Sequence, residues 1–504
     1  MKRKTNLTHV LVLAGILVFC SIALCNCSRA SMPDSGDLIG CIELVNDTGD
    51  SSLDANDNSG VTVALYELAE LDTAIVRINQ EYPNIGIQIN QETEFEHRIS
   101  NPLLITTTNS EGCFRMKEIR IGNYNLVIMK QGWGYKYIYN VRISEGENNL
   151  NVRSDTGCIK ANAEYLYPCI NLPNVVQTPL RLQTERVYRV ESDTIVLSEV
   201  IVEPGVKILM DEGCKLEFHS ILSCDPEGAF WRITSSDNIY STTKTNEFAQ
   251  YDKIGFHAPN SVNIQRMICE YSHNGVIINA EHFHLQESIL RHHYSQALVC
   301  SAQTTQMDYT LISNNDLKAI TAFYDFSLSA SIVYGNGDAC FLSESSANIS
   351  NNYFQANHIA LRPFYGDVQI ANNCFNDNDS AISPSASNPT IRCNNFYCNK
   401  RDIELNGYYT HVTLDFCNPS VEDNNFYESG WYVHLKGSNS VYASGTYLYN
   451  GVDHDQVYPD NYLLANDLVS HIFDANNPNS DGFPYVVNFL PRRLAPNNGA
   501  GILY

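Results

Sequence analysis

The sequence predicts an all-β protein in which a small β-sandwich is followed by a right-handed parallel β-helix solenoid. Three observations support this prediction. Apolar residues recur about every 21 residues between positions 264 and 396, asparagines recur beside them, and short apolar segments separated by Gly and Asn fill much of residues 38–130. A regular period of this length indicates stacked units, each of which packs against its neighbours.

Each predicted unit is one coil of short strands. The residues that begin the units step by 21, 22, 21, 21, 21 and 21: Ile264, Leu285, Met307, Leu328, Ile349, Ile370 and Ile391. Another apolar residue follows each of them five positions later: Cys269, Leu290, Ile312, Val333, Phe354, Phe375 and Phe396. A second series consists of Val276, Leu298, Ile320 and Cys340. Such units are too short for two helices, so we expect strands.

The recurring asparagines predict how each coil turns. In an extended chain, residues five apart point to opposite faces, yet both are apolar here, so a corner must lie between them. Asparagine tolerates the left-handed conformation that a one-residue corner needs, and it stands three positions after the start of four late coils: Asn352, Asn373, Asn394 and Asn424. Stacked coils would join these amides in a hydrogen-bonded ladder. This pattern favours a β-helix over a leucine-rich repeat or a propeller.

The ends of the repeat carry two further patterns. The segment VEPGV at 202–206 is similar to the first coil of many bacterial β-helix domains, and residues 471–491 are similar to their closing segment, although the Asn-Tyr/Trp-Trp-Gly element that often precedes it is absent. Residues 185–495 therefore resemble the pectin-lyase-like superfamily. The resemblance implies a fold shared by polysaccharide lyases, hydrolases and epimerases and by members without known activity, so it implies no particular reaction.

The N-terminal half has a different pattern. Segments 38–45, 60–68, 112–119 and 123–130 predict the strands of a small antiparallel sandwich. The region resembles the carboxypeptidase regulatory-like domain at these positions: Gly40, Val63, Leu65, Tyr66, Gly112, Phe114, Gly122, Tyr124, Leu126, Lys130 and Gly132. The resemblance implies a non-catalytic, prealbumin-like spacer or docking module. We expect a sandwich at 37–152, a proline-containing linker at 153–182 and the β-helix at 183–495.

The N-terminus predicts export. Lys2, Arg3 and Lys4 precede an apolar run over 10–24, which is the layout of a signal peptide. Residues 1–27 also resemble a bacterial lipobox region in which Cys27 is lipidated, although Asn26 stands where a small residue is usual. A transmembrane anchor and a soluble product cut after Ala30 remain alternatives. We expect a lipoprotein held at the outer membrane or cell surface, or else a secreted protein.

Charge and cysteine usage exclude several functions. With 32 basic and 56 acidic residues the net charge is −24, which repels nucleic acid and anionic lipid. Three of the 16 cysteines lie in the signal region, and the other 13 show no spacing typical of a zinc site. Several stand at core positions of the repeat, so we interpret them as buried small apolar residues. We expect no metal ion and no cofactor, with calcium implied only if the protein is a lyase.

Catalytic residues are not evident. The lyases of this superfamily use a basic residue and calcium-binding carboxylates on neighbouring coils, so the resemblance implies such residues here if the protein is a lyase. The outward neighbours of the series that begins at Ile264 form a polar, uncharged wall instead. Glu270, Glu287 and Asp308 fall at different offsets in their coils and are interpreted as solvated turn charges. A base or a metal cluster is conceivable at Arg291 with His282, His284, His292 and His293, but we interpret these as turn histidines. Residues 453–455 are interpreted as a polar loop in preference to metal ligands, and residues 376–379 resemble a calcium loop only in composition.

Four apolar residues are expected on the outside of neighbouring coils: Ile277, Val299, Phe323 and Phe341. Either a loop covers them, or they form a stacking platform for sugars or a partner. Two hypotheses follow. The first is a non-catalytic surface protein that binds a glycan or another surface protein, and the second is a secreted polysaccharide lyase or glycoside hydrolase. The missing charged stripe favours the first.

Overall fold

The computed structural model describes residues 34–49, 51–151, 163–220, 222–224, 228–245, 247–344, 346–385, 387 and 389–406, short stretches at 408–409, 414–415, 420–422, 425–427, 431–436 and 462–463, and residue 502. The chain divides into two units, which are described separately. Unit 1 comprises Met1–Leu68, Asn101–Lys130 and Lys136–Leu166, and unit 2 comprises Ala69–Ser100, Gln131–Tyr135 and Tyr167–Tyr504. No helix within the described residues has the length and apolarity to cross a membrane.

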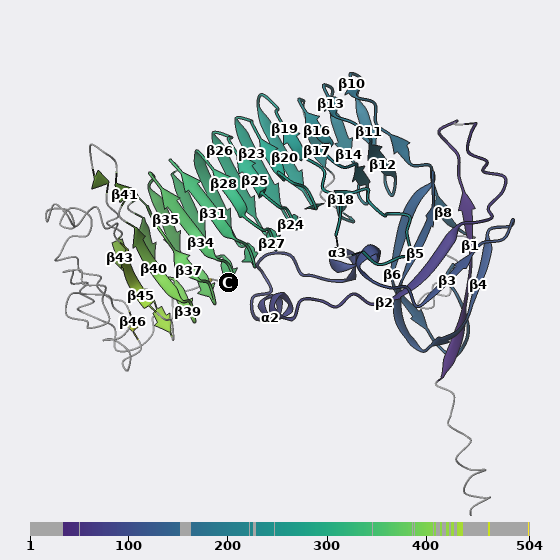
Figure 1. Ribbon diagram of the computed structural model, residues 1–504, viewed down its shortest axis with the longest axis horizontal. Helices are drawn as coiled ribbons and strands as arrows, with labels where there is room; N and C mark the ends of the chain where they lie inside the picture. Colours follow the sequence, from purple (N-terminus) through teal and green to yellow (C-terminus); the bar gives the residue numbers. More distant parts are fainter. Residues whose placement is uncertain are drawn as a thin grey trace, which may run out of the picture. The chain divides into compact units, whose positions relative to one another are not determined.

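The N-terminal region is a β-sandwich, as predicted (Figure 1). One sheet contains β4 (Cys113–Arg120), β1 (Ser35–Leu44), β7 (Gly146–Asn149) and β8 (Glu164–Leu166). The other contains, in order, β3 (Leu104–Thr107), β2 (Thr62–Glu67), β5 (Gly122–Lys130) and β6 (Gly134–Ile143). The expectation of purely antiparallel sheets was wrong, because β1 pairs antiparallel with β4 but parallel with β7 and β8.

Unit 2 contains a right-handed parallel β-helix of about 11 coils, as predicted. Each regular coil contributes one strand to each of three parallel sheets. The eight-stranded sheet contains β20 (Ser261–Gln265), β23 (His282–Gln286), β26 (Thr304–Asp308), β29 (Asp325–Ser329), β32 (Ala347–Ser350), β35 (Val368–Ala371), β38 (Thr390–Arg392) and β43 (Ser420–Glu422). A three-stranded sheet of the first coils contains β11 (Leu180–Leu182), β14 (Val200–Val202) and β17 (Leu222–Cys224).

The other two sheets are longer. The 13-stranded sheet contains β9 (Ile170–Asn171), β12 (Val187–Val190), β15 (Lys207–Met210), β18 (Trp231–Ser235), β21 (Met267–Glu270), β24 (Ile289–Arg291), β27 (Leu311–Ser313), β30 (Ile332–Tyr334), β33 (Tyr353–Gln355), β36 (Cys374–Asn376), β39 (Asn395–Tyr397), β44 (Asn425–Tyr427) and β46 (Tyr462–Leu463). The 12-stranded sheet contains β10 (Val175–Val176), β13 (Thr194–Val196), β16 (Lys215–Phe218), β19 (Lys253–Phe256), β22 (Val276–Ile278), β25 (Gln296–Cys300), β28 (Lys318–Ala322), β31 (Asp338–Ser343), β34 (Ile359–Phe364), β37 (Ser380–Ile382), β40 (Arg401–Asn406) and β45 (Trp431–Lys436). A short antiparallel pair joins β41 (Tyr408–Tyr409) to β42 (Leu414–Asp415).

The coil corners are left-handed, but one position earlier than expected. In the coils that carry the asparagines, the first corner residues are Asn351, Asn372 and Cys393, with φ between 55° and 58°. A second left-handed corner follows five positions later in each regular coil, at Ala356, Asp377 and Cys398 in these three. The prediction that Asn352, Asn373 and Asn394 themselves adopt this conformation was therefore wrong. These three follow the corner, so their side chains point into the coil.

Two ladders of buried amides run along the β-helix. In the first, Nδ2 of Asn352 donates to Oδ1 of Asn373 at 3.1 Å, and Nδ2 of Asn373 donates to Oδ1 of Asn394 at 3.0 Å. Asn424 lies outside the described residues. The second ladder was not foreseen and follows the second corner in the same way, with hydrogen bonds between successive members of this set: Asn315, Asn336, Asn357, Asn378 and Asn399. Both ladders satisfy backbone groups that the corners expose.

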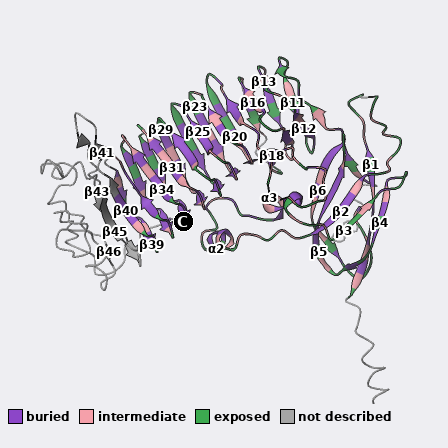
Figure 2. Ribbon diagram, in the orientation of Figure 1, coloured by how far each residue is buried: buried purple, intermediate pink, exposed green. Residues whose placement is uncertain are grey.

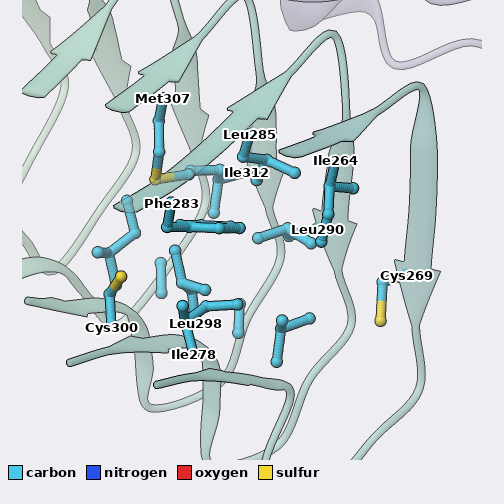
Figure 3. Packing of buried hydrophobic residues seen from close by; sticks show 14 of the residues in the cluster. Ile264, Cys269, Ile278, Phe283, Leu285, Leu290, Leu298, Cys300, Met307 and Ile312 are labelled. Atoms are coloured by element: carbon cyan, nitrogen blue, oxygen red, sulfur yellow. The ribbon is translucent and has the colours of Figure 1, made fainter. Parts of the chain in front are cut away.

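The core lies inside the coils. The two predicted apolar series face inward and are buried (Figure 3). Phe354, Phe375 and Phe396 stack at ring-centroid distances of 5.0 and 5.1 Å. Cys269 and Cys340 are buried in this core, in agreement with their interpretation as small apolar residues. Along β20 and β23 of the eight-stranded sheet, buried positions alternate with half-buried or exposed ones, whereas β18 and β21 of the 13-stranded sheet are buried throughout (Figure 2).

The segment Ala69–Ser100 belongs to unit 2, although the sequence placed it in the sandwich. It contains α2 (Thr73–Glu81), α3 (Gln91–Glu94) and the 3-10 helix η1 (His97–Ile99). Its isoleucines pack on the outward side chains of the 13-stranded sheet in one buried cluster, which contains Ile75, Ile78, Ile85, Ile87 and Ile89 from the segment and Ile268, Ile289, Leu311, Ile332, Tyr353 and Cys374 from the sheet. An outer sheet face that is apolar requires such a cover.

The β-helix also begins earlier than expected. Residues 170–182, assigned to a linker, form β9, β10 and β11, which pair with β12, β13 and β14. Their short strands, each with one or two aliphatic residues, complete the first coil despite the prolines at 173 and 179. Residues 152–162 and the proposed closing segment 471–491 lie outside the described residues.

Candidate functional site

A shallow groove of about 740 Å³ runs over the outer face of the eight-stranded sheet. The predicted polar wall lines it. One row holds side chains in parallel register on successive coils: Asn263, His284, Gln306, Ser327, Asn348 and Gln369. A second row along the groove contains His282, Thr304 and Asp325, and Ser346 and Asp367 also line it. Because neighbouring strands lie about 4.8 Å apart, each row presents one polar side chain about every 4.8 Å along the groove.

The groove continues toward the first coils. A second hollow of about 280 Å³ shares Asn263 and His284 with the first and extends to Ser223 on β17 and to Gln265 and Gln286. The two hollows together form an elongated polar surface, which we call the outer groove. Its shape suits an extended chain better than a compact ligand.

Hydrogen bonds fix several groove side chains. The Nδ1 of His282 lies 2.6 Å from Thr304 Oγ1, and the Nε2 of His284 lies 3.1 Å from Asp308 Oδ2. Asp308 also accepts a hydrogen bond from the hydroxyl of Ser329. Asp308 is therefore held within the protein and is buried, not a solvated turn charge as expected. Asn348 and Gln369, by contrast, are exposed.

The outer groove presents hydrogen-bonding side chains and two exposed carboxylates. Asp325 and Asp367 are exposed and stand two coils apart, with Ser346 between them, which separates their backbones by about 10 Å. Amides, hydroxyls and imidazoles supply donors and acceptors to a ligand rich in hydroxyl groups.

The predicted outward stripe is only partly assembled. Ile277, Val299 and Phe341 share a row of the 12-stranded sheet, but the residue between Val299 and Phe341 is Thr321. Phe323 lies two positions further on, beyond the end of β28, and its side chain is 37% exposed. The expectation that all four form one stripe was therefore wrong. Phe341 is half-buried and stacks on Phe364 with ring centroids 5.9 Å apart.

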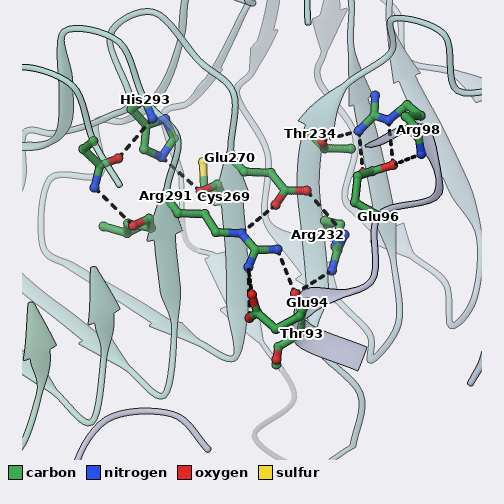
Figure 4. A network of polar contacts seen from close by, with 12 residues as sticks. Thr93, Glu94, Glu96, Arg98, Arg232, Thr234, Cys269, Glu270, Arg291 and His293 are labelled. Carbon is green, nitrogen blue, oxygen red and sulfur yellow. Dashed lines mark hydrogen bonds and ion pairs between the residues drawn. The ribbon is translucent and has the colours of Figure 1, made fainter. Parts of the chain in front are cut away.

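Glu270 and Arg291 lie in a buried ionic network instead of in solvated turns, so that interpretation was wrong (Figure 4). Arg291 Nε donates to Glu270 Oε2 at 3.0 Å, and Arg291 Nη1 donates to Glu94 at 3.0 Å. Arg232 also contacts Glu270, at 3.4 Å. Burial raises the pKa of the Glu270 carboxyl, but the positive charges of Arg232 and Arg291 outweigh burial and hold it below its ordinary value. The network joins the 13-stranded sheet to α3.

A second ion pair lies beside this network. Arg98 donates from Nε to Glu96 Oε1 at 2.8 Å and from Nη2 to Glu96 Oε2 at 2.7 Å, and its Nη1 donates to the carbonyl of Ser235 at 2.7 Å. Arg98 and Glu96 are buried. Together the two groups hold three negative and three positive charges, so their formal charges cancel: Glu94, Glu96, Glu270, Arg98, Arg232 and Arg291. This arrangement anchors the segment Ala69–Ser100, with five of the six charged residues buried and Glu94 half-buried.

The other candidates also have structural roles. His293 is buried, and its Nδ1 lies 2.6 Å from Ser272 Oγ. It directly follows the left-handed corner at His292, which is the position that Asn315 holds one coil later. His292 is a half-buried left-handed corner residue that stacks on Tyr271. Within residues 376–379, Asn378 belongs to the second ladder. Glu287 occupies a corner and pairs with Arg266 at 2.9 Å. Cys27 and residues 453–455 lie outside the described residues.

The chain was compared with known proteins in three ways. No protein-family model matches it, and neither a curated protein nor a solved structure matches it. The parallel β-helix is thus established by the strand pairing of this structure.

Proposed function

We propose that the protein binds an extended, neutral polysaccharide in the outer groove and does not cleave it. The observation that supports this function is the row of polar side chains in register on six successive coils, from Asn263 to Gln369. An extended glycan repeats its hydroxyl groups at a spacing similar to the separation of the strands. Each sugar therefore meets an equivalent donor or acceptor on each coil.

Charge favours a neutral ligand. The net charge of −24 and the exposed Asp325 and Asp367 in the groove repel polyuronates and sulfated glycans unless a cation lies between them. Neutral glycans carry no such penalty. The half-buried row of Ile277, Val299 and Phe341 lies on another sheet and is not part of this proposal.

We also propose that the protein is exported and anchored through a lipid on Cys27, with the glycan or a surface protein as its partner. The basic n-region, the apolar run and the lipobox-like residues support this location. The sandwich would then act as a spacer related to carboxypeptidase regulatory-like domains, and the solenoid would be a pectin-lyase-like member without catalysis. Cys27→Ser should abolish incorporation of labelled fatty acid in the producing cells, whereas Cys25→Ser should retain it. Incorporation that survives Cys27→Ser would contradict the assignment.

The glycan proposal is tested by titrating the purified chain from Ser28 onward with neutral and acidic polysaccharides in a calorimeter. We expect binding to a neutral glycan, and we expect Asn348→Ala combined with Gln306→Ala to weaken it about tenfold or more, because each lost hydrogen bond contributes about 0.5 to 1.5 kcal/mol. The matched control is Asn279→Ala, an exposed asparagine next to the 12-stranded sheet. Equal losses in both variants, or binding to none of the glycans, would contradict the proposal.

The same samples decide between binding and catalysis. New reducing ends or unsaturated products, with or without calcium, would show that the protein is a hydrolase or a lyase. We expect neither product to form.

A further inference from the structure

Two histidines and a glutamate meet on the outer face of the 12-stranded sheet, away from the outer groove. Glu217 points outward from β16, and His219 follows the end of that strand. His257 follows β19, the next strand of the same sheet. Phe218 pairs with Phe256, so His219 and His257 occupy equivalent positions on neighbouring coils. Their ring centroids are 4.9 Å apart.

Gly255 makes room for this cluster. It lies opposite Glu217 in the sheet, where any other residue would place an outward side chain. A Cβ atom at Gly255 would lie 2.6 Å from His257 Nε2 and 3.2 Å from Glu217 Cγ. The ring of His257 therefore folds back over Gly255 toward Glu217, and it depends on the missing side chain to do so.

The ligand atoms are close enough to share one ion. One atom from each of the three residues lies within 4.8 Å of the other two, and His219 Nε2 lies 3.6 Å from Glu217 Oε2. A tetrahedral zinc ion with bonds of about 2.0 to 2.1 Å needs ligand atoms about 3.3 Å apart. Small side-chain rotations are enough to reach that separation.

A lysine orients the carboxylate of this cluster. Lys253 Nζ lies 3.3 Å from Glu217 Oε1, which leaves Oε2 directed to the histidines. This oxygen and one nitrogen of each imidazole ring are the donor atoms that one ion would share.

We infer that Glu217, His219 and His257 bind one divalent transition-metal ion, with Zn²⁺ as the ion that suits a donor set of two imidazoles and one carboxylate. The side chain of His219 is 38% exposed, so the ion lies at the surface and its fourth position is open to water or to an external ligand. The site is independent of the proposed glycan groove.

The test is to titrate the chelator-treated, desalted full mature chain with ZnCl₂ in a calorimeter, and with Co²⁺ while recording its visible spectrum. We expect one Zn²⁺ per chain and the intense visible bands of four-coordinate Co²⁺. His219→Ala and His257→Ala should each weaken Zn²⁺ binding by about tenfold or more. Gly255→Ala should also weaken it, because the added methyl group displaces the His257 ring while all three ligands remain.

The matched control is His273→Ala, an exposed histidine that stacks on Tyr294, and it should bind Zn²⁺ like the parent protein. Thermal unfolding in the absence of metal shows whether each variant is folded, and Glu217→Gln supplies a variant of unchanged size. Absence of Zn²⁺ binding by the parent protein would overturn the inference. So would unchanged affinity in both His219→Ala and His257→Ala, since the ion would then be bound elsewhere.

Discussion

Arg291 and Glu270 lie opposite each other on neighbouring coils, with Nε and Oε2 3.0 Å apart, and both are buried beneath residues that precede the β-helix in the chain. Arg291 also donates to the carbonyl of Thr93 at 2.7 Å and to Glu94. An outward-pointing arginine of the solenoid thus serves as an attachment point for a short helix about 200 residues earlier in sequence.

Replacing one member of this network should destabilise the protein strongly. Arg291→Leu leaves the buried Glu270 and the half-buried Glu94 without a main partner, and we expect the free energy of unfolding to fall by about 3 to 5 kcal/mol. Urea unfolding followed by circular dichroism measures this loss. Arg181→Ala is the control, because it removes an exposed pair with Glu203 and should cost less than about 1 kcal/mol. A similar small loss in both variants would show that the network is not a structural anchor.

The asparagine ladder predicts a second large effect. The Asn373 side chain accepts hydrogen bonds from the backbone and side chain of Asn352 and donates to Asn394 and to the carbonyls of Ile349 and Ala371. Asn373→Ala leaves several buried groups unpaired, at about 1 to 3 kcal/mol for each. We expect a loss of at least about 3 kcal/mol in urea unfolding. The exposed Asn348→Ala should change it by no more than about 0.5 kcal/mol.

Stability should depend on pH through buried histidines. Burial lowers the pKa of His97 to about 4 and that of His293 to about 3. The unfolded chain takes up protons near pH 6.5 while these folded imidazoles stay neutral, so stability is full above about pH 6.5 and falls as the pH drops toward 4. Each histidine contributes a slope of about 1.4 kcal/mol per pH unit in this window.

His293→Asn tests the contribution of His293 to this pH dependence. Asparagine should fit at this position, because Asn315 holds the equivalent position in the next coil. The difference in unfolding free energy between pH 5 and pH 7 should shrink by about 2 kcal/mol. The titratable neighbours that act on His293 are His292 and Glu270, and both remain in the variant. The exposed His273→Asn should leave the difference unchanged. A difference that His293→Asn does not alter would contradict the assignment.

The solenoid was predictable because stacking makes the sequence periodic. A core position such as Ile349 must match Ile370 one coil later, so the apolar pattern reports the coil directly. The corner was misplaced by one residue because Asn351 and Asn352 are adjacent, and asparagine suits both the left-handed corner and the ladder. Only the backbone conformation, which the sequence does not show, tells which of the two asparagines is the corner residue and which is the ladder residue. Phe323 was misplaced because it stands three positions after Ile320, whereas the strand register pairs Thr321, which directly follows Ile320, with Phe341.

Contacts outside the period were not predictable. The isoleucines of the segment Ala69–Ser100 show an amphipathic pattern, but nothing in that pattern identifies the sheet face that they cover. Glu270 and Arg291 face each other at the 21-residue spacing of the repeat, but the segment that covers them and supplies Glu94 to Arg291 is distant in sequence, so in the sequence they look like turn charges. Likewise, His219 and His257 are 38 residues apart, so they fall outside the 21-residue spacing that would have brought them together.

Gly86 gives the last prediction, because it joins the segment Ala69–Ser100 to the β-helix by a backbone hydrogen bond. Its amide donates to the carbonyl of Ala330 at 2.7 Å, its φ is +58°, and an added Cβ atom would lie 2.6 Å from the side chain of Ile332. Gly86→Ala should therefore detach residues near 82–90 locally, since both the backbone conformation and the contact oppose a side chain. We expect faster hydrogen exchange and faster proteolysis in this segment. Gln88→Ala, which changes an exposed side chain of the same segment, should leave both rates unchanged. Equal exchange in the two variants would show that this contact does not hold the segment in place.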